Sequence, residues 1–589
     1  MKTYQYMWRM IRYRPWLYAL NALIWITIRV LPLVPGLIAQ QFFNLLPREA
    51  HLTSTLWTLI VFLVVTALAR VVLYLAGGLV DTLHRFSMVN ILRRNLLERI
   101  LERPGARAVP DSPGEAISRF RDDAEQAEDA VSWTLDNMGD ALFAIIAVII
   151  MLKIDALITL LVFVPLIGVI ATVQIVSERL EKYRRASRKA TGHITGAIGE
   201  IFSSVQAIQV STAEPYVVAH FQKLNEKRRG AMLKDAVLTQ LLDSTFANIV
   251  GLGTGFILIL AAQAIRAKQL GIGDLALFIY YLAFATESTH SFGVFLAHYK
   301  QTKVAFQRMD KLLQGAPAAQ LVAHRPLYLS GDIPALTVPV KTDEQHLQVL
   351  EAKGLKYHYP DTGRGIENID LRVQRGSMTV ITGRIGSGKT TLLEVLLGLL
   401  PKDTGEILWN GLPVNDPATF FVPPRSAYTA QVPHLFSDTL KENILLGLPE
   451  DKVDLVGAIH AAVMERDLEE LEQGLHTTIG TRGVKLSGGQ AQRSAAARMF
   501  VRDAELFVFD DLSSALDVET EHILWDRLFS QRKSTYLIVS HRRTVLQRAD
   551  HIIVLKEGRV DSQGTLQELL QTSPELQRLW HGDVVGKTQ

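Results

Sequence analysis

The chain has 589 residues, of which 48% are hydrophobic and 21% are charged, and its formal net charge is only +3. This length predicts more than one domain, and high hydropathy combined with an ordinary charge content predicts a membrane part and a soluble part. The small net charge argues against a nucleic-acid-binding protein. The absence of cysteine excludes disulfides, thiolate metal sites and a cysteine nucleophile.

The N-terminus carries Lys2, Arg9, Arg12 and Arg14 ahead of the first long apolar run. That run continues well past the length of a signal-peptide core and shows no small-residue cleavage site, so a cleaved signal is the less favoured alternative. We expect an amphipathic segment on the membrane surface, followed by a spanning helix.

Six apolar runs are long enough to cross a bilayer, which takes about 20 residues. They cover about residues 16–46, 54–80, 131–152, 156–176, 236–265 and 273–297. Only Lys153–Asp155 separates the third run from the fourth, which predicts a tight turn at one membrane face. Basic residues gather at the N-terminus and in two polar stretches, about 81–130 and 177–235, so we expect these regions and both chain ends in the cytoplasm. Helical patterning continues through both stretches, so the helices should extend beyond the membrane.

Charged residues within the apolar runs include Arg29, Arg70, Asp140, Asp243 and Glu287. Charges at such positions are costly and face the interior of a helix bundle. Two interpretations stay open, internal ion pairs that fix the packing or a polar path that contacts cargo near Glu287. Pro32, Pro35 and Gly36 in the first run, and Gly251–Gly255 in the fifth, permit kinks or close helix contacts.

The character of the sequence changes after residue 313. Residues 314–346 are punctuated by Pro, Ala and Gly and predict a linker. From Leu347 onward short apolar strands alternate with helices, which is typical of an α/β domain. We therefore expect a transmembrane domain over residues 1–313, a linker over 314–346 and an α/β domain over 347–589.

The stretch GRIGSGKT, Gly383–Thr390, fits the phosphate-binding pattern G-x-x-x-x-G-K-[ST] and lies between an expected strand and an expected helix. Its glycines let backbone N–H groups contact phosphate oxygens, and the helix N-terminus favours negative charge. We expect Lys389 to reach the β- and γ-phosphates and Thr390 to offer its hydroxyl to Mg²⁺. The fold class predicted is a membrane all-α domain followed by an α/β P-loop nucleotide-binding domain. The ATP contacts predicted in this loop are Gly383, Arg384, Gly386, Ser387, Gly388, Lys389, Thr390 and Thr391.

Three further motifs follow: LSGGQAQR at Leu486–Arg493, a strand that ends at Asp510, and YLIVSHR with His541. In this order they resemble the ATP-binding cassette family, and the six-helix region resembles the half-transporters of its exporter branch. The resemblance covers essentially the whole chain, and it is strong in the nucleotide domain and weaker in the membrane part. It implies ATP-driven export across the cytoplasmic membrane, with ATP and Mg²⁺ bound in the cytoplasm and an unknown substrate.

The resemblance also implies roles for matching residues. Tyr359 would stack on adenine, although an ordinary strand-edge tyrosine is the alternative. Gln431 would contact Mg²⁺ and the attacking water, and Asp510 would bind Mg²⁺ through water. His541 would contact the γ-phosphate, and Asp517 would reach across to a partner subunit. The signature residues that would lie over the nucleotide bound to that partner are Ser487, Gly488, Gly489 and Gln490.

Communication between the domains would involve two cytoplasmic segments, Ser112–Gln126 and Thr212–Phe221, as coupling helices. Tyr216 and Phe221 would be aromatic contacts to a nucleotide domain, whereas a solvated helix face explains the charges of the first segment nearly as well. Thr481 stands where exporters commonly have an acidic residue ahead of the signature. Communication through that loop is then weaker or carried by another residue.

Asp511 follows Asp510 at the position where the family normally has Glu as general base. Such a base contributes about 10²–10⁴-fold and must approach the proton to about 2.6–3.2 Å. A misplacement of about 1 Å costs about 10²-fold, so we predict slow hydrolysis at this chain's own site with ATP binding retained.

In the resembling family, Asp at this place is typical of one chain of a heterodimer whose intact signature completes the active site of the other. A second, different half-transporter is therefore the favoured partner. A homodimer with a working Asp base, and a lipid flippase or importer on the same fold, stay open. A soluble cassette ATPase and a membrane-bound nucleotide sensor are the rival classes.

Overall fold

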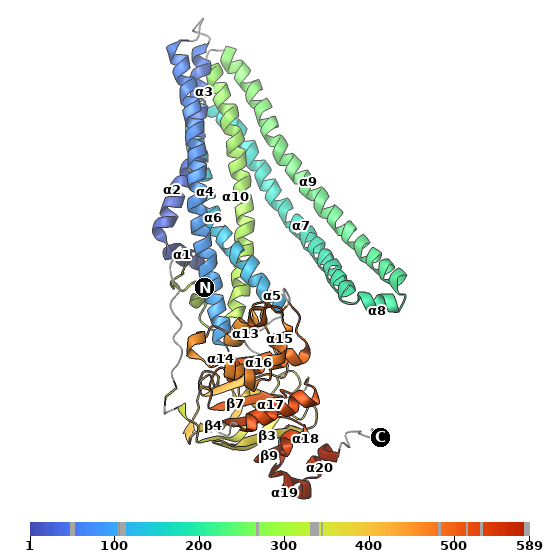
Figure 1. Ribbon diagram of the computed structural model, residues 1–589. Coiled ribbons are helices and arrows are strands. Elements are labelled where there is room, and N and C mark those ends of the chain that lie inside the picture. Colours follow the sequence, from blue (N-terminus) through green and yellow to red (C-terminus); the bar gives the residue numbers. More distant parts are fainter. Residues whose placement is uncertain are drawn as a thin grey trace. The chain divides into compact units, whose positions relative to one another are not determined.

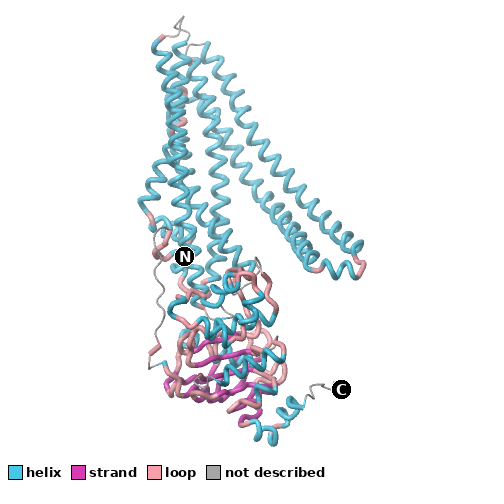
Figure 2. Tube along the Cα trace, viewed as in Figure 1, coloured by secondary structure: helices cyan, strands magenta, loops and turns pink. Residues whose placement is uncertain are grey.

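The computed structural model describes the chain except residues 47–52, 104, 106–112, 267–269, 330–340, 343–344, 481–483, 514–515, 531–533 and 582–589. Its residues form two compact units, residues 1–98 with 111–327 and residues 99–110 with 328–589. Helices make up the first, here called the helical unit, and the described strands all lie in the second, the α/β unit (Figure 2). This division leaves the predicted limits of the linker untested, because residues 330–340 lie outside the described part.

Each of the six predicted apolar runs falls on helix in the helical unit, and the first run is divided between two helices. The stretches Pro15–Leu45, Ser54–Glu102 and Gly114–Ile154 are long and apolar enough to cross a membrane by length and composition, in the part searched. The elements are α1 (Thr3–Tyr13), α2 (Pro15–Val30), α3 (Leu33–Leu45), α4 (Ser54–Glu102), α5 (Pro113–Ser118), a π-helical turn (Arg119–Asp123), α6 (Ala124–Ile154), α7 (Ala156–Ser203), α8 (Val205–Val210), α9 (Glu214–Arg266), α10 (Ile272–Leu312) and a 3-10 turn (Ala318–Val322).

Several helices are much longer than a bilayer requires. Helices α4, α7 and α9 have 49, 48 and 53 residues, against the roughly 20 that span a membrane. Helix therefore continues well past the apolar runs at 54–80, 156–176 and 236–265, and how far it extends beyond a membrane stays a prediction. Helices α7 and α9 lie side by side, and α8 joins their ends (Figure 1).

Local chemistry explains the breaks between helices. Leu31 and Pro32 separate α2 from α3, because proline has no N–H to donate and its ring clashes with the preceding turn. One residue, Asp155, separates α6 from α7, and its side chain accepts from the N–H of Ile158 at 3.0 Å, which caps α7. The predicted tight turn is confirmed, and the break at Pro32 is one of the two outcomes, a kink or a close helix contact, that the prolines and glycine of the first run permit.

Of the glycines at residues 251–255, Gly253 acts through a close helix contact, whereas a Cβ on Gly251 or Gly255 would meet nothing within 4 Å. Helix α9 is continuous, and a Cβ on Gly253 would lie 2.8 Å from Cδ2 of Leu282 in α10. A Cβ on Gly36 would lie 2.4 Å from Cε1 of Tyr281, whose hydroxyl donates to the carbonyl of Leu33 at 2.8 Å. Small residues thus let α10 approach both α3 and α9 closely.

The α/β unit contains two sheets. An antiparallel sheet has the order β2 (Gly365–Gln374), β1 (Val349–His358), β4 (Thr404–Trp409) and β5 (Leu412–Pro413). A six-stranded sheet has the order β10 (Arg559–Gly564), β9 (His551–Lys556), β3 (Met378–Gly383), β8 (Thr535–Val539), β7 (Leu506–Asp510) and β6 (Ser426–Thr429). Its pairs are parallel except that of β10 with β9.

Ten helices and two 3-10 turns accompany these sheets. They are α11 (Lys389–Leu396), α12 (Pro417–Phe420), α13 (Leu440–Leu445), α14 (Leu455–Ala461), α15 (Glu465–Glu470), α16 (Gly488–Phe500), α17 (Val518–Ser530), α18 (Arg543–Leu546), α19 (Leu566–Thr572), α20 (Pro574–His581), and the turns Glu450–Lys452 and Gly474–His476, all among the described residues.

Burial of the central strands explains where the site lies. Every residue of β3, β7 and β8 is buried, as expected for parallel strands covered on both faces. Because these strands are parallel, their carboxyl ends meet at one edge, where ligands bind in open α/β sheets. The P-loop follows β3, Asp511 follows β7 and His541 lies just beyond β8, so the fold brings three separate motifs to the same edge.

Candidate nucleotide site

The P-loop between β3 and α11 depends on glycine at two positions. Gly388 has φ +98° immediately before α11, and a Cβ there would lie 3.0 Å from Cγ2 of Ile366. Gly383 has φ +149°, and a Cβ would lie 2.3 Å from the carbonyl oxygen of Leu555. Side chains rarely adopt this backbone conformation, so glycine is required for the loop to wrap as it does.

Lys389 is the first residue of α11 and lies over this loop. Its Nζ donates to the carbonyls of Gly383 and Arg384, each at 2.9 Å. Burial lowers the pKa of Lys389, whereas the charges of Asp510 and Asp511 act to raise it. The structure therefore brings the predicted lysine and the two predicted acids together.

Asp510 ends β7 and is 1% exposed. Burial raises the pKa of Asp510, a hydrogen bond from Thr390 lowers it, the charge of Asp511 raises it and that of Lys389 lowers it. Within the described part of the chain, Asp510 Oδ2, Asp511 Oδ1 and Ser387 Oγ are buried without a hydrogen-bond partner. Buried polar atoms of this kind are costly unless a ligand, ion or water completes them, so these residues fit a phosphate and a hard cation such as Mg²⁺.

A third acid near this site, Glu394 on α11, is absent from the sequence prediction. Burial raises the pKa of Glu394, and the charge of Asp510 raises it further. Tyr428 at the end of β6 has its pKa raised by burial and then by Asp510 and Glu394. Glu394 stands four residues after Thr390 and so shares its helix face, which is the sequence signal that would have found it.

Asp511 leaves the sheet with a left-handed backbone. Its N–H donates to the carbonyl of Val539 at 3.0 Å, and its φ is +53°. Asp and Asn adopt this region several times more readily than other side chains, glycine excepted. The backbone therefore provides a local reason for aspartate at this position, beside the functional reason predicted from the sequence.

Three other predicted nucleotide residues occupy loops of the α/β unit. Tyr359 directly follows β1, is 36% exposed, and its hydroxyl lies 3.4 Å from Oγ1 of Thr391. One residue separates Gln431 from the end of β6, and one residue separates His541 from the end of β8. Both side chains are exposed. Tyr359 is thus placed beside the P-loop helix, and the other two are free to approach a ligand.

The signature residues form the start of α16. Ser487 Oγ accepts from the N–H of Gln490 at 3.2 Å, and Gln490 Oε1 accepts from the N–H of Ser487 at 2.9 Å. This reciprocal pair is a capping box, and it leaves Gly488 and Gly489 in the first turn. Asp517 similarly accepts from the N–H of Thr520 at 2.9 Å at the start of α17. Ser487, Gln490 and Asp517 therefore have a local structural role in addition to the predicted one.

A buried acid from the end of the unit supports the P-loop. Glu575 on α20 is 3% exposed, and its Oε1 lies 2.5 Å from Nε of Arg384, the second residue of the loop. Arg543 stacks on Trp580 of α20, with 5.4 Å between its guanidinium carbon and the ring centroid. Glu575 is 191 residues from Arg384, so no local sequence pattern could have paired them.

In the helical unit, the predicted intramembrane charges differ from one another. Arg29 lies 2.7 Å from Oδ1 of Asp136 and 3.6 Å from Oδ1 of Asp140, which supports the ion-pair interpretation at this position. Asp136 is absent from the prediction, although its four-residue spacing from Asp140 was a usable signal. Glu287 is exposed, and the side chain of Asp243 lies outside the described residues.

The first predicted coupling segment is helical where it is described, and the second is helical from Glu214 onward. The first contains α5 and the π-helical turn, where Arg119 is 1% exposed and lies 2.8 Å from Glu115. The second overlaps the start of α9, where Tyr216 is 76% exposed. Thr481 lies outside the described residues. Their coupling roles stay predictions.

Comparison with known proteins gives matches to two family models, to named relatives and to a solved structure. A family model described as ABC transporter matches residues 366–514, and one described as ABC transporter transmembrane region matches residues 21–288. An ATP-dependent lipid A-core flippase of Chromohalobacter salexigens is 27% identical over 490 residues, 82% of this chain and 81% of the relative. A Bacillus subtilis protein provisionally named as a multidrug export ATP-binding/permease protein is 27% identical over 477 residues, 79% of each chain. A solved bacterial Atm1-family ABC exporter with ATP bound has the same fold, with a TM-score of 0.74, 19% identity, and coverage of 97% of this chain and 99% of that one.

Proposed function

The chain belongs to the ABC transporter family, and we propose that it exports a substrate across the cytoplasmic membrane as one half of a dimeric exporter. It is a multi-pass membrane protein and an ATPase. The observation that carries the proposal is that one chain joins helices long and apolar enough to cross a membrane with a P-loop whose lysine lies beside a buried aspartate. Both chain ends and the α/β unit would then be cytoplasmic, as the distribution of basic residues indicates.

Each predicted site residue has a chemical part in this proposal. Lys389 and the loop N–H groups bind the β- and γ-phosphates, and Tyr359 stacks on the adenine. Thr390, Asp510 and Gln431 would hold Mg²⁺, which when bound neutralises charge on the phosphate oxygens. Ser487, Gly488 and Gly489 contact the nucleotide bound to the partner subunit. Asp517 reaches across to that subunit, and His541 contacts the γ-phosphate.

The second subunit is proposed to be a different half-transporter that carries Glu directly after the aspartate that corresponds to Asp510. Asp511 is one methylene shorter than that base, so this chain's own site binds ATP and hydrolyses it slowly. The signature of this chain, LSGGQ, is intact and completes the faster site of the partner. A homodimer with a working Asp base is the alternative.

Two substitutions at residue 511 separate these alternatives in the assembled, membrane-reconstituted complex. Asparagine adopts a positive φ as readily as aspartate does, but it cannot act as a base. Asp511→Asn therefore tests the role of the base without changing the preference of the backbone. Under the heterodimer proposal, ATP turnover of the complex stays within about twofold of wild type. Under the homodimer alternative, it falls by about 10²–10⁴-fold, the usual contribution of a general base.

Asp511→Glu provides the opposite test. Restoring the longer side chain should speed hydrolysis at this chain's own site by up to about 10²-fold if reach is limiting, even though Glu tolerates the left-handed backbone less well. Turnover of the whole heterodimer should then rise by up to about twofold, because the partner's site already hydrolyses ATP. Unchanged turnover would contradict the idea that reach limits hydrolysis. Subunit identification by native mass spectrometry of the extracted complex provides an independent check, since a single-species dimer would overturn the heterodimer.

A lipid flippase is the second candidate function, because similar proteins carry the name ATP-dependent lipid A-core flippase. The two candidates differ in what is moved. In vesicles that contain the complex, ATP-dependent movement of labelled lipid between leaflets would favour the flippase, and ATP-dependent accumulation of a soluble dye would favour an exporter of soluble cargo.

A further inference from the structure

A pocket of about 310 Å³ lies in the helical unit, between the break of the first span and helix α4. Most of its wall is apolar, formed by Leu31, Pro32, Pro35, Leu63, Ala67 and Val71. This volume is within the range of small-ligand pockets, about 300–1,000 Å³. The proline break described above is what opens the space, because Pro32 and Pro35 themselves form part of the wall.

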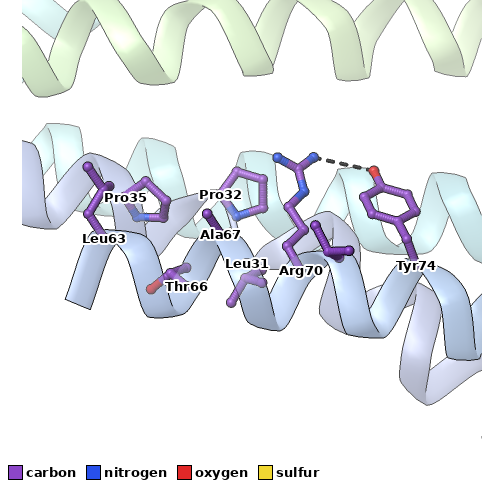
Figure 3. A pocket seen from close by; sticks show the side chains of 9 residues that line it. Leu31, Pro32, Pro35, Leu63, Thr66, Ala67, Arg70 and Tyr74 are labelled. Atoms are coloured by element: carbon purple, nitrogen blue, oxygen red, sulfur yellow. Dashed lines mark hydrogen bonds between the residues drawn. The ribbon is translucent and has the colours of Figure 1, made fainter. Parts of the chain in front are cut away.

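The polar groups of this pocket lie together at one end. Figure 3 shows the guanidinium of Arg70 facing the phenol of Tyr74, with Pro35 and Leu63 toward the other end. Nη2 of Arg70 lies 3.4 Å from the Tyr74 hydroxyl, and its guanidinium carbon lies 5.5 Å from the ring centroid. The hydroxyl of Thr66 is already bonded to the carbonyl of Phe62 at 2.7 Å, so Arg70 and Tyr74 set the polarity of the pocket.

Arg70 differs from the other intramembrane arginine in its partners. Arg29 has two carboxylates, Asp136 and Asp140, whereas Arg70 forms no ion pair with a carboxylate in the described part of the chain. Nε of Arg70 is buried without an acceptor there, and so is Nε1 of Trp25, whose ring packs edge-on against Tyr74 at 6.1 Å. A charge within a span is costly, and Tyr74 is the described contact of Arg70, with no described carboxylate to neutralise its charge.

We propose that this pocket binds an anionic amphiphile, with its acidic headgroup on Arg70 and Tyr74 and its alkyl chain against Pro32, Pro35, Leu63 and Ala67. The donors at the polar end lack a described carboxylate, so they select an anion, and the apolar wall selects a hydrocarbon chain. Binding at this site requires no ATP, so it can be measured separately from the proposed transport activity. The ligand could reach it as a resident lipid or as cargo, and both share this chemistry.

The test uses the full-length complex in nanodiscs of zwitterionic lipid, with two probes that differ only in charge, a fluorescent fatty acid and its methyl ester. A charge-assisted contact is strong compared with a neutral one, so the wild type should bind the acid at least about tenfold more tightly than the ester. Arg70→Gln should bring the two affinities within about twofold of each other, and Arg70→Lys should retain most of the preference. Ala67→Phe should weaken both probes equally, because it fills the apolar end.

Arg29→Gln is the matched control, since it also removes an arginine from a span but leaves the pocket intact. It should preserve the preference for the acid. Equal binding of acid and ester by wild type would overturn the proposal. So would an Arg70→Gln variant that keeps the preference, or one that weakens only subunit assembly, which would indicate that Arg70 pairs with the partner chain.

A transport measurement distinguishes the two sources. ATP-dependent movement of the fatty acid across vesicles, lost in Arg70→Gln, supports the site as a cargo site. Binding without movement supports it as a site for a resident acidic lipid.

Discussion

The α/β unit and the helical unit both bury charged groups, but they differ in how those groups are partnered. In the described part of the α/β unit, the unpaired buried atoms at the P-loop edge include those of three motif residues, Ser387, Asp510 and Asp511. In the helical unit, one intramembrane arginine is neutralised by two acids, while Arg70 has no described carboxylate partner. At these two places, unpaired polar groups coincide with a sequence motif in one unit and with a pocket in the other, although further unpaired atoms lie elsewhere in both units.

The difference teaches how a site can be recognised in each kind of scaffold. A P-loop needs a fixed backbone, so its residues are adjacent in sequence and readable as a pattern. A site between helices is formed by residues from successive turns of one helix together with residues of another. Only the packing of the helices shows which of their charges already have a partner. The following predictions test whether the units can be perturbed separately, from the largest effect to the smallest.

Lys389→Ala should weaken ATP binding at this chain's own site by about a hundredfold, because it removes charge-assisted contacts to phosphate. Photolabelling of this chain with an azido-ATP at increasing concentration measures the change. Fatty-acid binding by the same complex should stay at the wild-type value. A simultaneous loss of both would contradict the separation between the two units.

Arg29→Ala should destabilise the helical unit by about 2 kcal/mol, because it leaves Asp136 and Asp140 without a counter-charge. Arg70→Ala removes no such partner and should change stability by less than about 0.5 kcal/mol. Thermal unfolding of the detergent-extracted complex, measured with a signal from the helical unit, compares the stabilities of the two variants. Equal destabilisation would remove the contrast on which the pocket proposal partly depends.

Glu575→Ala should lower ATP affinity by about tenfold with little change in the turnover of bound nucleotide, since Arg384 would lose the carboxylate that holds it. Glu568→Ala is a suitable control, because Glu568 is also an acid of the C-terminal helices and only caps α19. The comparison is made on the apparent KM for ATP and on kcat. A fall in kcat alone would show that Glu575 does not position the loop.

Glu505→Gln tests a fully partnered acid of the α/β unit. Glu505 accepts from Lys341 at 2.7 Å and from the N–H of Leu347 at 3.0 Å. Burial alone would raise the pKa of Glu505, but these contacts outweigh burial and lower the pKa. A carboxyl whose pKa is lowered by folding stabilises above its unfolded pKa, about 4.3, and loses that contribution as the pH falls through the folded value. The variant should therefore be about 1 kcal/mol less stable than wild type at pH 7, with a difference that shrinks in acid. A difference that does not vary with pH would contradict the ion-pair account.

Much of the fold was predictable because it depends on local pattern. The apolar runs, the break at Pro32 and the one-residue turn at Asp155 follow from hydropathy and backbone chemistry. The P-loop followed from its motif, and the clustering of Lys389, Asp510 and Asp511 followed from parallel strand ends meeting at one edge.

The remainder depends on contacts between residues distant in sequence or on backbone angles. Whether Arg29 or Arg70 is neutralised is decided by helix packing, and Glu575 reaches Arg384 only in the folded unit. The left-handed φ of Asp511 is invisible in the sequence, yet it favours the same residue that the functional argument favours. From the sequence alone, aspartate at position 511 is explained by its role in hydrolysis, although the backbone conformation also favours this residue.

The bond between Arg384 and Glu575 also has a consequence for synthesis on the ribosome. Chains emerge from the N-terminus and domains fold largely in that order, but here the acid that holds the phosphate loop is made 191 residues after the arginine it binds. The loop thus acquires its final support only when α20 has emerged. A nascent chain arrested before that helix would carry every nucleotide motif and still bind ATP less tightly, so the emergence of α20 gives the loop its final support.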